Sequence, residues 1–437
     1  MNELLKKLIL LIGIITALTS FSIIDEEGEA YKKKNKHNKV FKNTTENMSV
    51  YTGYQGWFNT PTDGSQLGWK HYKRHFHKGG EISPTQMGIE AWPDVSEFPK
   101  EALYDTPLKF KDGSTAQLFS SVHPATSDIH FRWMKEYDID AAFMQRFVTA
   151  LKSPKKVNNY NTVLKNAVDA SRKHGRAISV MYDLTGIVGE DGVNTLINDW
   201  KSLVDELKLT SKNGDVYLGH DKKPLVAIWG VGFDPTGTKR KYDLKDCQKI
   251  IDFLKNDPVY GGCSILIGVP TYWREGIKDS KSDPLLHELI KESDICLPWY
   301  TGRFNNKSIK KVYPLMKADK EWCDANNIDF MPVLSPGFSW SNLYPDQPFN
   351  HIPREKGHYF WQQIYSASKA NVKMVYLGMF DELDEATCFF KISNKIPQGV
   401  RMIDNEGLPS DHMLWLAKEG KKMLEKRSEL MESQPQK

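Results

Sequence analysis

The regular alternation of two kinds of segment constrains the fold of this chain more than any other feature. From residue 50 onward, short apolar segments rich in β-branched or aromatic residues alternate with longer amphipathic segments, which is typical of parallel strands joined by helices. We expect eight strands, over residues 50–58, 139–147, 177–183, 224–231, 264–270, 295–300, 330–335 and 372–380. The helical patterns cover residues 128–137, 160–174, 193–207, 243–255, 285–292, 308–325, 355–369 and 410–426.

Eight strands alternating with eight helices favour an α/β fold, the (β/α)8 TIM barrel. A doubly wound open sheet is the alternative, but no glycine-rich phosphate turn follows the first strand. We predict a single barrel domain over residues 50–430 and a C-terminal tail over 431–437. The first connection between strand and helix, residues 59–127, is unusually long. Loops of this length are usually functional or disordered, and in a barrel this one would lie on the catalytic face.

The N-terminus has the pattern of a secretory signal. Lys6 and Lys7 precede an apolar stretch over residues 8–18, and small residues follow it. Because the stretch is too short for a comfortable membrane span, we predict a signal peptide over 1–24, with an uncleaved anchor as the alternative. A polar linker is expected over 25–49. The protein would then be exported to the periplasm, the cell surface or the medium, without further contact with a membrane.

Charge, cysteines and histidines argue against several classes of protein. The net charge of +4 does not indicate a nucleic-acid surface, and we expect a monomer. The five cysteines are widely spaced with no C-x-x-C pair, which argues against a zinc ribbon and a dense disulfide scaffold. We expect mostly buried free thiols, with one disulfide as the alternative. His71, His75 and His77 are surrounded by cations, so we expect a solvated or sugar-facing loop there, with no metal and no cofactor.

Aromatic and hydrogen-bonding residues recur where the predicted strands end. In a barrel these ends surround one cleft. Aromatic walls with fixed polar groups suit a carbohydrate, because sugar ring faces are weakly apolar and their rims carry hydroxyls. The predicted substrate-binding residues are Tyr54, Gln55, Trp57, Arg146, Tyr182, Trp229, Trp299, Tyr300 and Asp381.

An acidic segment follows the eighth predicted strand. Four carboxylates within residues 381–385 come directly after an apolar stretch, where a charge must be paired, protonated or used. In a helical turn, Glu382 and Glu385 would share one face and could act as general acid and as nucleophile or base on a glycosidic bond. Asp381 and Asp384 would support them by pairing with Arg146 or Arg303. A solvated acidic loop and a Ca²⁺ site are the alternatives.

Several segments together carry a resemblance to a known group of proteins. They are residues 51–58, 68–69, 119–124, 130–134, 143–147 and 379–385. The chain resembles bacterial proteins of the glycoside hydrolase family 71/99-like type, and family 99, the endo-α-mannosidases and endo-α-1,2-mannanases, is the nearest with an established mechanism. The resemblance implies a (β/α)8 barrel that retains configuration and needs no cofactor.

The same resemblance implies roles for two residues. Glu382 would deprotonate the sugar 2-hydroxyl, which attacks C1 to give a 1,2-anhydro sugar, and Glu385 would act as acid and base. Asp381 and Leu383 depart from the family pattern, and we expect the substrate to differ there. The expected function is therefore an exported glycoside hydrolase that cleaves an α-linked glycan. The alternatives are a non-catalytic carbohydrate-binding barrel, an α-glucanase, or a glycosidase of the xylosidase or arabinosidase type.

Overall fold

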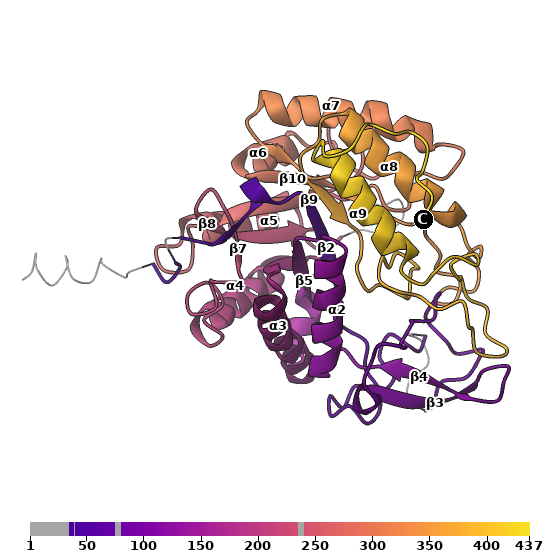
Figure 1. Ribbon diagram of the computed structural model, residues 1–437. Coiled ribbons are helices and arrows are strands. Elements are labelled where there is room, and N and C mark those ends of the chain that lie inside the picture. The colour runs from indigo at the N-terminus through magenta and orange to yellow at the C-terminus, as the bar shows by residue number, and fades with distance from the viewer. Residues whose placement is uncertain (1–34, 39, 75–79, 235–239) are drawn as a thin grey trace, which may run out of the picture.

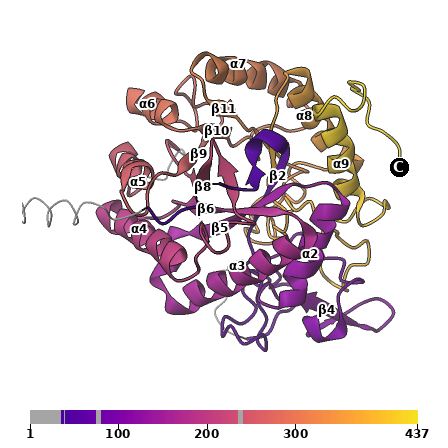
Figure 2. The same cartoon turned by 60° about the vertical axis from the view of Figure 1, so that its left-hand side comes forward.

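A ring of parallel strands forms the centre of the molecule in the computed structural model, which describes residues 35–38, 40–74, 80–234 and 240–437. Within the ring, neighbouring strands pair in parallel, including the last with the first, except that the strands Asp329–Phe330 and Val333–Leu334 do not pair with each other. Figure 2 shows the strands within a layer of helices. The ring contains β2 (Val50–Tyr54), β5 (Ala141–Phe147), β6 (Ala177–Asp183), β8 (Lys223–Trp229), β9 (Ser264–Val269), β10 (Ile295–Pro298), β11 (Asp329–Phe330), β12 (Val333–Leu334) and β13 (Val375–Leu377).

The ring closes through a seventh strand that is divided in two. The first half, β11, pairs with β10, and the second half, β12, pairs with β13. Only Met331 and Pro332 separate the halves, and Pro332 has no N–H to donate to a neighbouring strand. The backbone N–H of Met331 donates to the carbonyl of Cys296 over 2.9 Å, and the carbonyl of Pro332 accepts from Tyr376 over 3.0 Å. Counted as one strand, the two halves complete the predicted (β/α)8 barrel, which the structure confirms.

A helix covers the outside of the barrel after each strand, as Figures 1 and 2 show. All eight overlap the segments predicted from the sequence. They are α2 (Pro124–Glu136), α3 (Pro154–His174), α4 (Gly189–Asp205), α5 (Leu244–Asn256), α6 (Pro284–Glu292), α7 (Val312–Ala325), α8 (His358–Lys369) and α9 (His412–Leu424). Several begin with recognisable signals, such as Pro154 in the first turn of α3 and a capping box at Asp243 before α5.

Alternate residues of the strands fill the barrel interior. Tyr51, Phe143, Met181, Leu266 and Tyr376 belong to one fully buried cluster. Their neighbours along each strand belong to a second, larger cluster, which also contains the buried faces of the helices. This division follows from the period of two in a strand, which sends successive side chains to opposite faces.

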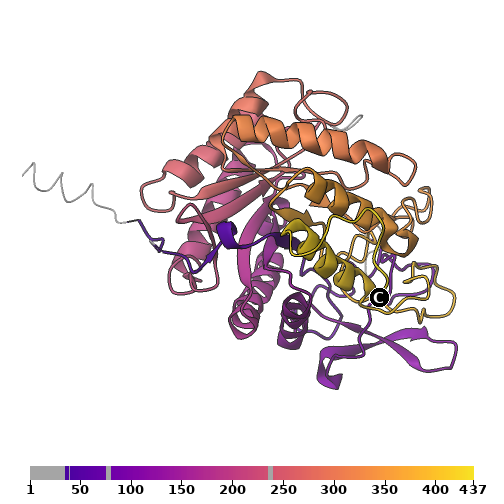
Figure 3. The ribbon, with the colours of Figure 1, turned by 45° about the horizontal axis from the view of Figure 1, so that its top comes forward.

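The long first connection contains structure that the sequence did not indicate. A short helix, η2 (Lys100–Ala102), leads into an antiparallel hairpin of β3 (Leu103–Lys109) and β4 (Thr115–Phe119), which extends from one side of the barrel in Figure 3. The connection also binds the chain that follows β13. Glu90 donates from its N–H to the carbonyl of Leu383 over 2.8 Å and accepts from Ile403 over 2.7 Å. The acidic segment is thereby held between two connections at the end of the barrel.

The described part of the predicted N-terminal linker contains structure as well. β1 (Asn43–Thr44) pairs with β7 (Leu218–His220), η1 (Thr45–Asn47) follows it, and Phe41 is buried. The apolar contacts of Phe41 explain why this polar segment does not behave as a free linker there. The predicted signal peptide lies outside the described residues. Among those residues, no helix is long and apolar enough to cross a membrane, and all five cysteines are buried free thiols.

Candidate active site

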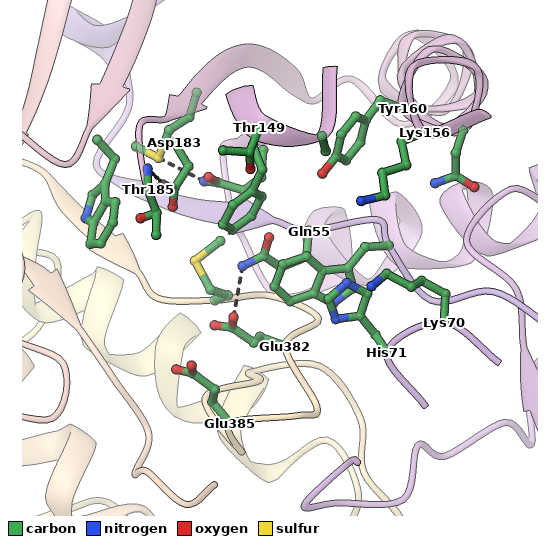
Figure 4. Close-up of a pocket in the computed structure, with 18 of the residues that line it drawn as sticks. Gln55, Lys70, His71, Thr149, Lys156, Tyr160, Asp183, Thr185, Glu382 and Glu385 are labelled. Carbon is green, nitrogen blue, oxygen red and sulfur yellow. Dashed lines mark hydrogen bonds between the residues drawn. The ribbon is translucent and has the colours of Figure 1, made fainter. Parts of the chain in front are cut away.

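A cavity of about 520 Å³ opens at the carboxyl ends of the barrel strands. Its lining comes from the ends of β2, β5, β6, β8, β10 and β13, from the first connection and from the start of α3. Figure 4 shows much of the lining, with the acidic segment on one side and two lysines on another. The lining residues are Gln55, Trp57, Asn59, Leu67, Lys70, His71, Gln145, Phe147, Thr149, Ala150, Lys156, Asn159, Tyr160, Met181, Asp183, Thr185, Trp229, Trp299, Tyr344, Met379, Glu382 and Glu385.

The acidic segment after β13 is a tight turn held by backbone hydrogen bonds. Phe380 donates to the carbonyl of Gly53 over 2.8 Å, which ties the segment to β2. The N–H of Ala386 donates to the carbonyl of Leu383 over 3.3 Å, and Ala386 has a positive φ of 54°. The segment is therefore a turn rather than the helical turn that the sequence suggested. Both Glu382 and Glu385 nevertheless line the same cavity.

Glu382 is buried and oriented by two hydrogen-bond donors. Nε2 of Gln55 donates to its Oε1 over 3.0 Å, and Oγ1 of Thr387 donates to its Oε2 over 2.8 Å. Burial and the neighbouring carboxyls of Glu385 and Asp384 raise the pKa of Glu382. The Thr387 hydroxyl opposes this shift, because a donor stabilises the ionised form.

Glu385 has no such donors. No described residue donates a hydrogen bond to its carboxylate, and burial raises its pKa from 4.5 to about 7. Because Glu382 and Glu385 repel each other, one proton is shared by the pair near neutral pH. Two effects oppose each other at Glu382: its hydrogen-bond donors favour the ionised form, whereas burial and the charges of Glu385 and Asp384 raise its pKa well above 4.5.

The two aspartates of the segment form hydrogen bonds that fix the turn, and their partners differ from those predicted. Asp381 accepts from the backbone N–H groups of Gln55 over 2.7 Å and Gly56 over 2.9 Å, and burial raises its pKa to about 6. Oδ2 of Asp384 lies 2.9 Å from Nδ1 of His71. The predicted arginine partners are wrong, because Arg146 pairs with Asp199 and Arg303 with Asp279.

A stacked pair of aromatic rings connects Asp384 to the cavity wall. The rings of Trp57 and His71 are parallel, with centroids 3.8 Å apart and an interplanar angle of 4°. Since His71 also contacts Asp384, the stack links the end of β2 to the acidic turn. The other predicted histidines, His75 and His77, lie outside the described residues. No group of three His, Cys, Asp or Glu side chains suited to a metal ion occurs in the described parts of the chain.

Four of the predicted substrate-binding residues line the cavity. They are Gln55, Trp57, Trp229 and Trp299. Trp229 and Trp299 come from neighbouring regions of the barrel end and meet edge to face, with ring centroids 5.3 Å apart. The cavity thus has indole walls beside polar groups, as the sequence indicated.

The other five predicted binding residues do not line the cavity, and the structure corrects their placement. The hydroxyl of Tyr54 lies 2.9 Å from Nδ1 of His130, and Asp381 binds backbone N–H groups. Tyr182 donates to Asp199 over 2.8 Å, and Tyr300 donates to Asp319 over 2.8 Å. The fifth residue, Arg146, is buried against Asp199. All of these side chains are packed behind the cavity wall.

The period of two in a strand explains most of this correction. Residues on either side of the misplaced ones line the cavity: Gln145 and Phe147 flank Arg146, and Met181 and Asp183 flank Tyr182. Strict alternation along β5 and β6 would have found Gln145 and Asp183. Lys70, Lys156, Asn159 and Tyr160 carried no comparable signal, because their position depends on the path of a loop and on the start of α3.

Fold and site together define a (β/α)8 barrel whose strand ends enclose an acidic, indole-walled cavity. Comparisons with solved structures agree with this description. The family 99 endo-α-mannosidase of Bacteroides thetaiotaomicron matches with a TM-score of 0.63 at 14% identity, over 86% of this chain and 97% of that one. A second structure of that enzyme, with Bis-Tris propane, has a TM-score of 0.62. At this identity the likeness shows a shared fold, which confirms the predicted resemblance at that level.

Sequence comparison gives a shorter match in the same direction. A human glycoprotein endo-α-1,2-mannosidase-like protein is 27% identical over 131 residues, which are 28% of each chain. Its counterpart in Danio rerio is 26% identical over 150 residues, 33% of this chain and 34% of that protein. The chain thus spans about a third or less of the curated relatives it matches. No family model matches the sequence.

Proposed function

We propose that this protein is a retaining glycoside hydrolase that cleaves an α-linked glycan in the manner of an endo-α-mannosidase. The observation that carries the proposal is the contrast between Glu382 and Glu385. Both line one cavity, yet among the described residues hydrogen-bond donors reach the carboxylate of Glu382 and not that of Glu385. Two carboxyl groups with different environments are what an acid and a base require. The shared fold with a family 99 endo-α-mannosidase supports the same assignment.

The two hydrogen-bond donors on Glu382 support a role for it as the base, with Glu385 as the acid. Glu385, with its pKa raised to about 7, would give its proton to the glycosidic oxygen as the bond from C1 to that oxygen breaks. Glu382 would accept the proton of the 2-hydroxyl as O2 attacks C1 and forms a 1,2-anhydro sugar. Glu385 would then take a proton from water, which opens the anhydro ring at C1 while Glu382 returns its proton to O2. The cycle ends with both groups in their starting states.

The remaining wall of the cavity supplies what a sugar needs. Trp57, Trp229 and Trp299 offer aromatic faces for sugar rings. Gln55 lines the cavity, and its buried Oε1 atom accepts no hydrogen bond from any described residue. Leu383 is fully buried and Asp381 binds backbone N–H groups. Asp381 and Leu383, the two residues that depart from the family pattern, would therefore affect specificity only indirectly, through the positions of Gln55 and of the acidic turn.

A screen with product analysis tests the proposal. The purified protein is incubated with α-mannans, α-glucans and plant glycans, and the anomer released first is identified by NMR. We expect hydrolysis of an α-linked glycan with retention, abolished in Glu385→Gln and Glu382→Gln but not in Glu101→Gln, a control at an exposed surface position. A substrate lacking the 2-hydroxyl on the cleaved sugar should resist cleavage. Glycan binding without turnover would instead favour a carbohydrate-binding barrel.

We also propose that the protein is exported. The proposal rests on the charged and apolar pattern of residues 1–24. Fractionation of cells expressing the full chain, with N-terminal sequencing of the product, tests it. Full-length protein confined to the cytoplasm would contradict export.

A further inference from the structure

Two lysines lie together at one end of the cavity, away from the catalytic pair. Lys70 belongs to the first connection and Lys156 to the first turn of α3, and both line the cavity. Figure 4 shows both side chains across the cavity from Glu385. Burial and then the charge of Lys156 lower the pKa of Lys70. The two ammonium groups are therefore close enough to repel each other.

In the parts of the chain that the structure describes, no ion pair joins Lys70 or Lys156 to a carboxylate. The acid that acts on Lys70 is Asp384, whose Oδ2 is already 2.9 Å from Nδ1 of His71. Holding two like charges together in a partly buried site costs free energy. A bound anion would offset that cost.

Further hydrogen-bond donors surround the same corner. Asn159 is 5% exposed, and its Oδ1 accepts from Nδ2 of Asn59 over 2.8 Å. No described residue accepts a hydrogen bond from its amide N–H groups, so a ligand can. Tyr160 also lines this part of the cavity. The N-terminus of the 21-residue helix α3 adds the positive end of its dipole beside Lys156. Lysine ammonium groups with amide and hydroxyl donors are typical of sites for oxyanions.

We propose that Lys70, Lys156 and Asn159 form an anion subsite that binds a carboxylate, sulfate or phosphate carried by the glycan. The inference rests on the proposed function, because it places a charged sugar in the same cavity. It identifies the substrate class as an acidic α-linked glycan. Uncharged glycans would fill the indole-walled part of the cavity without engaging this corner.

Binding to an inactive variant tests the subsite without requiring turnover. The Glu385→Gln protein is titrated calorimetrically with uncharged α-linked manno-oligosaccharides and with the same oligosaccharides carrying one uronate, one sulfate ester or one phosphate ester. We expect at least one charged series to bind about tenfold more tightly than its uncharged parent, and the series that does so identifies the anion. Added NaCl should weaken that preference.

Matched lysine variants in the Glu385→Gln background locate the effect. Lys70→Met and Lys156→Met should each bring the affinity ratio of charged to uncharged oligosaccharide close to one, and Lys70→Arg should keep most of it. Lys155→Met is the control, because Lys155 is adjacent to Lys156 in sequence but exposed and outside the lining. Thermal melting verifies that each variant is folded.

Two results would overturn the subsite. One is equal affinity for every charged series and its uncharged parent, and the other is a preference that survives in the double lysine variant. Failure of all oligosaccharides to bind would also count against it. The proposed hydrolase function is judged separately, since wild-type cleavage of an uncharged α-glycan, lost in Glu385→Gln, would uphold that function in the absence of an anion subsite.

Discussion

Gln55 donates a hydrogen bond from Nε2 to Oε1 of Glu382 over 3.0 Å, and its backbone N–H donates to Asp381 over 2.7 Å. One residue at the end of β2 thus fixes two members of the acidic turn after β13. These strands are neighbours only because the barrel closes, with Val375 beside Val50 in the register. The base of the proposed reaction therefore depends on the closure of the fold.

Removal of this donor should impair the base. In Gln55→Leu, which has a similar volume, we expect kcat/KM to fall about 100-fold, because Glu382 loses a hydrogen bond that orients it and favours its ionised form. The pKa of Glu382 should rise, so the acidic limb of the pH profile should move to higher pH. Steady-state kinetics across pH on a hydrolysed glycan would measure both effects.

Thr387 offers a matched comparison for the same carboxylate. Its hydroxyl donates to Oε2 of Glu382 over 2.8 Å. Thr387→Val, which removes the hydroxyl and keeps the shape, should lower kcat/KM about tenfold, whereas Thr387→Ser should remain close to wild type. Equal kinetics for the Val and Ser variants would show that this hydrogen bond does not contribute to catalysis.

The raised pKa of Glu385 predicts the upper limit of the active pH range. A general acid works only while protonated, so kcat/KM should decline as pH rises through about 7, the pKa of Glu385. A substrate with fluoride as leaving group needs no such proton, and its hydrolysis should lack this limb. An identical alkaline limb for the fluoride and for the natural glycan would assign the titration to another group.

The sequence was most informative where a periodic pattern set the structure. The eight strands were identifiable because apolar, β-branched segments recur between amphipathic ones. The residues of the cavity wall were harder to predict from the sequence. Arg146 and Gln145 are adjacent, and a shift of one residue moves a side chain from the barrel interior to the layer between strands and helices. The inward-facing residues of each strand could have been identified from Tyr51 and Phe143, whose large side chains fill the barrel interior.

Other features had no local signal. The corner formed by Lys70 and Lys156 depends on how a long connection folds against the start of α3. The partner of Asp384 was equally hidden, since His71 is 313 residues away in the chain. Such contacts arise from the path of loops, which composition and periodicity do not encode.

Stability should also depend on Glu385. Its pKa is about 7 in the folded protein and near 4.5 in an unfolded chain, so the folded state binds the proton more tightly. The stabilisation is complete below about pH 4.5 and is lost as pH rises through 7. Glu385→Gln removes this loss, and at pH 8 it should be more stable than wild type by up to about 3 kcal/mol.

Urea unfolding of wild type and Glu385→Gln at pH 4 and pH 8 measures this effect. The other buried acids are present in both proteins, so their contributions cancel in the difference. The difference in unfolding free energy should be small at the lower pH and favour the variant at the higher one. Glu101→Gln, at an exposed position, should show no such difference. A gain in Glu385→Gln that is independent of pH would mean that relief of burial strain, rather than proton release, causes it.

Arg146 should contribute to stability rather than to substrate binding. Its guanidinium donates from Nε to Oδ2 of Asp199 over 2.7 Å and from Nη1 to Asn161 over 3.1 Å, and its side chain is 2% exposed. Arg146→Met would leave the buried Asp199 carboxylate unpaired. The free energy of unfolding should fall by about 3 to 5 kcal/mol, while the KM of the folded fraction stays within about twofold of wild type, because Arg146 does not line the cavity.

A surface arginine and a double variant make this test specific. Arg132 pairs with Glu97 over 2.7 Å at a side-chain exposure of 38%, and Arg132→Met should cost less than about 1 kcal/mol. Asp199→Asn combined with Arg146→Met removes the unpaired charge, so it should recover part of the stability lost in the single variant. If Arg146→Met kept wild-type stability and had a tenfold higher KM, the result would instead support the sequence-based prediction that Arg146 binds substrate.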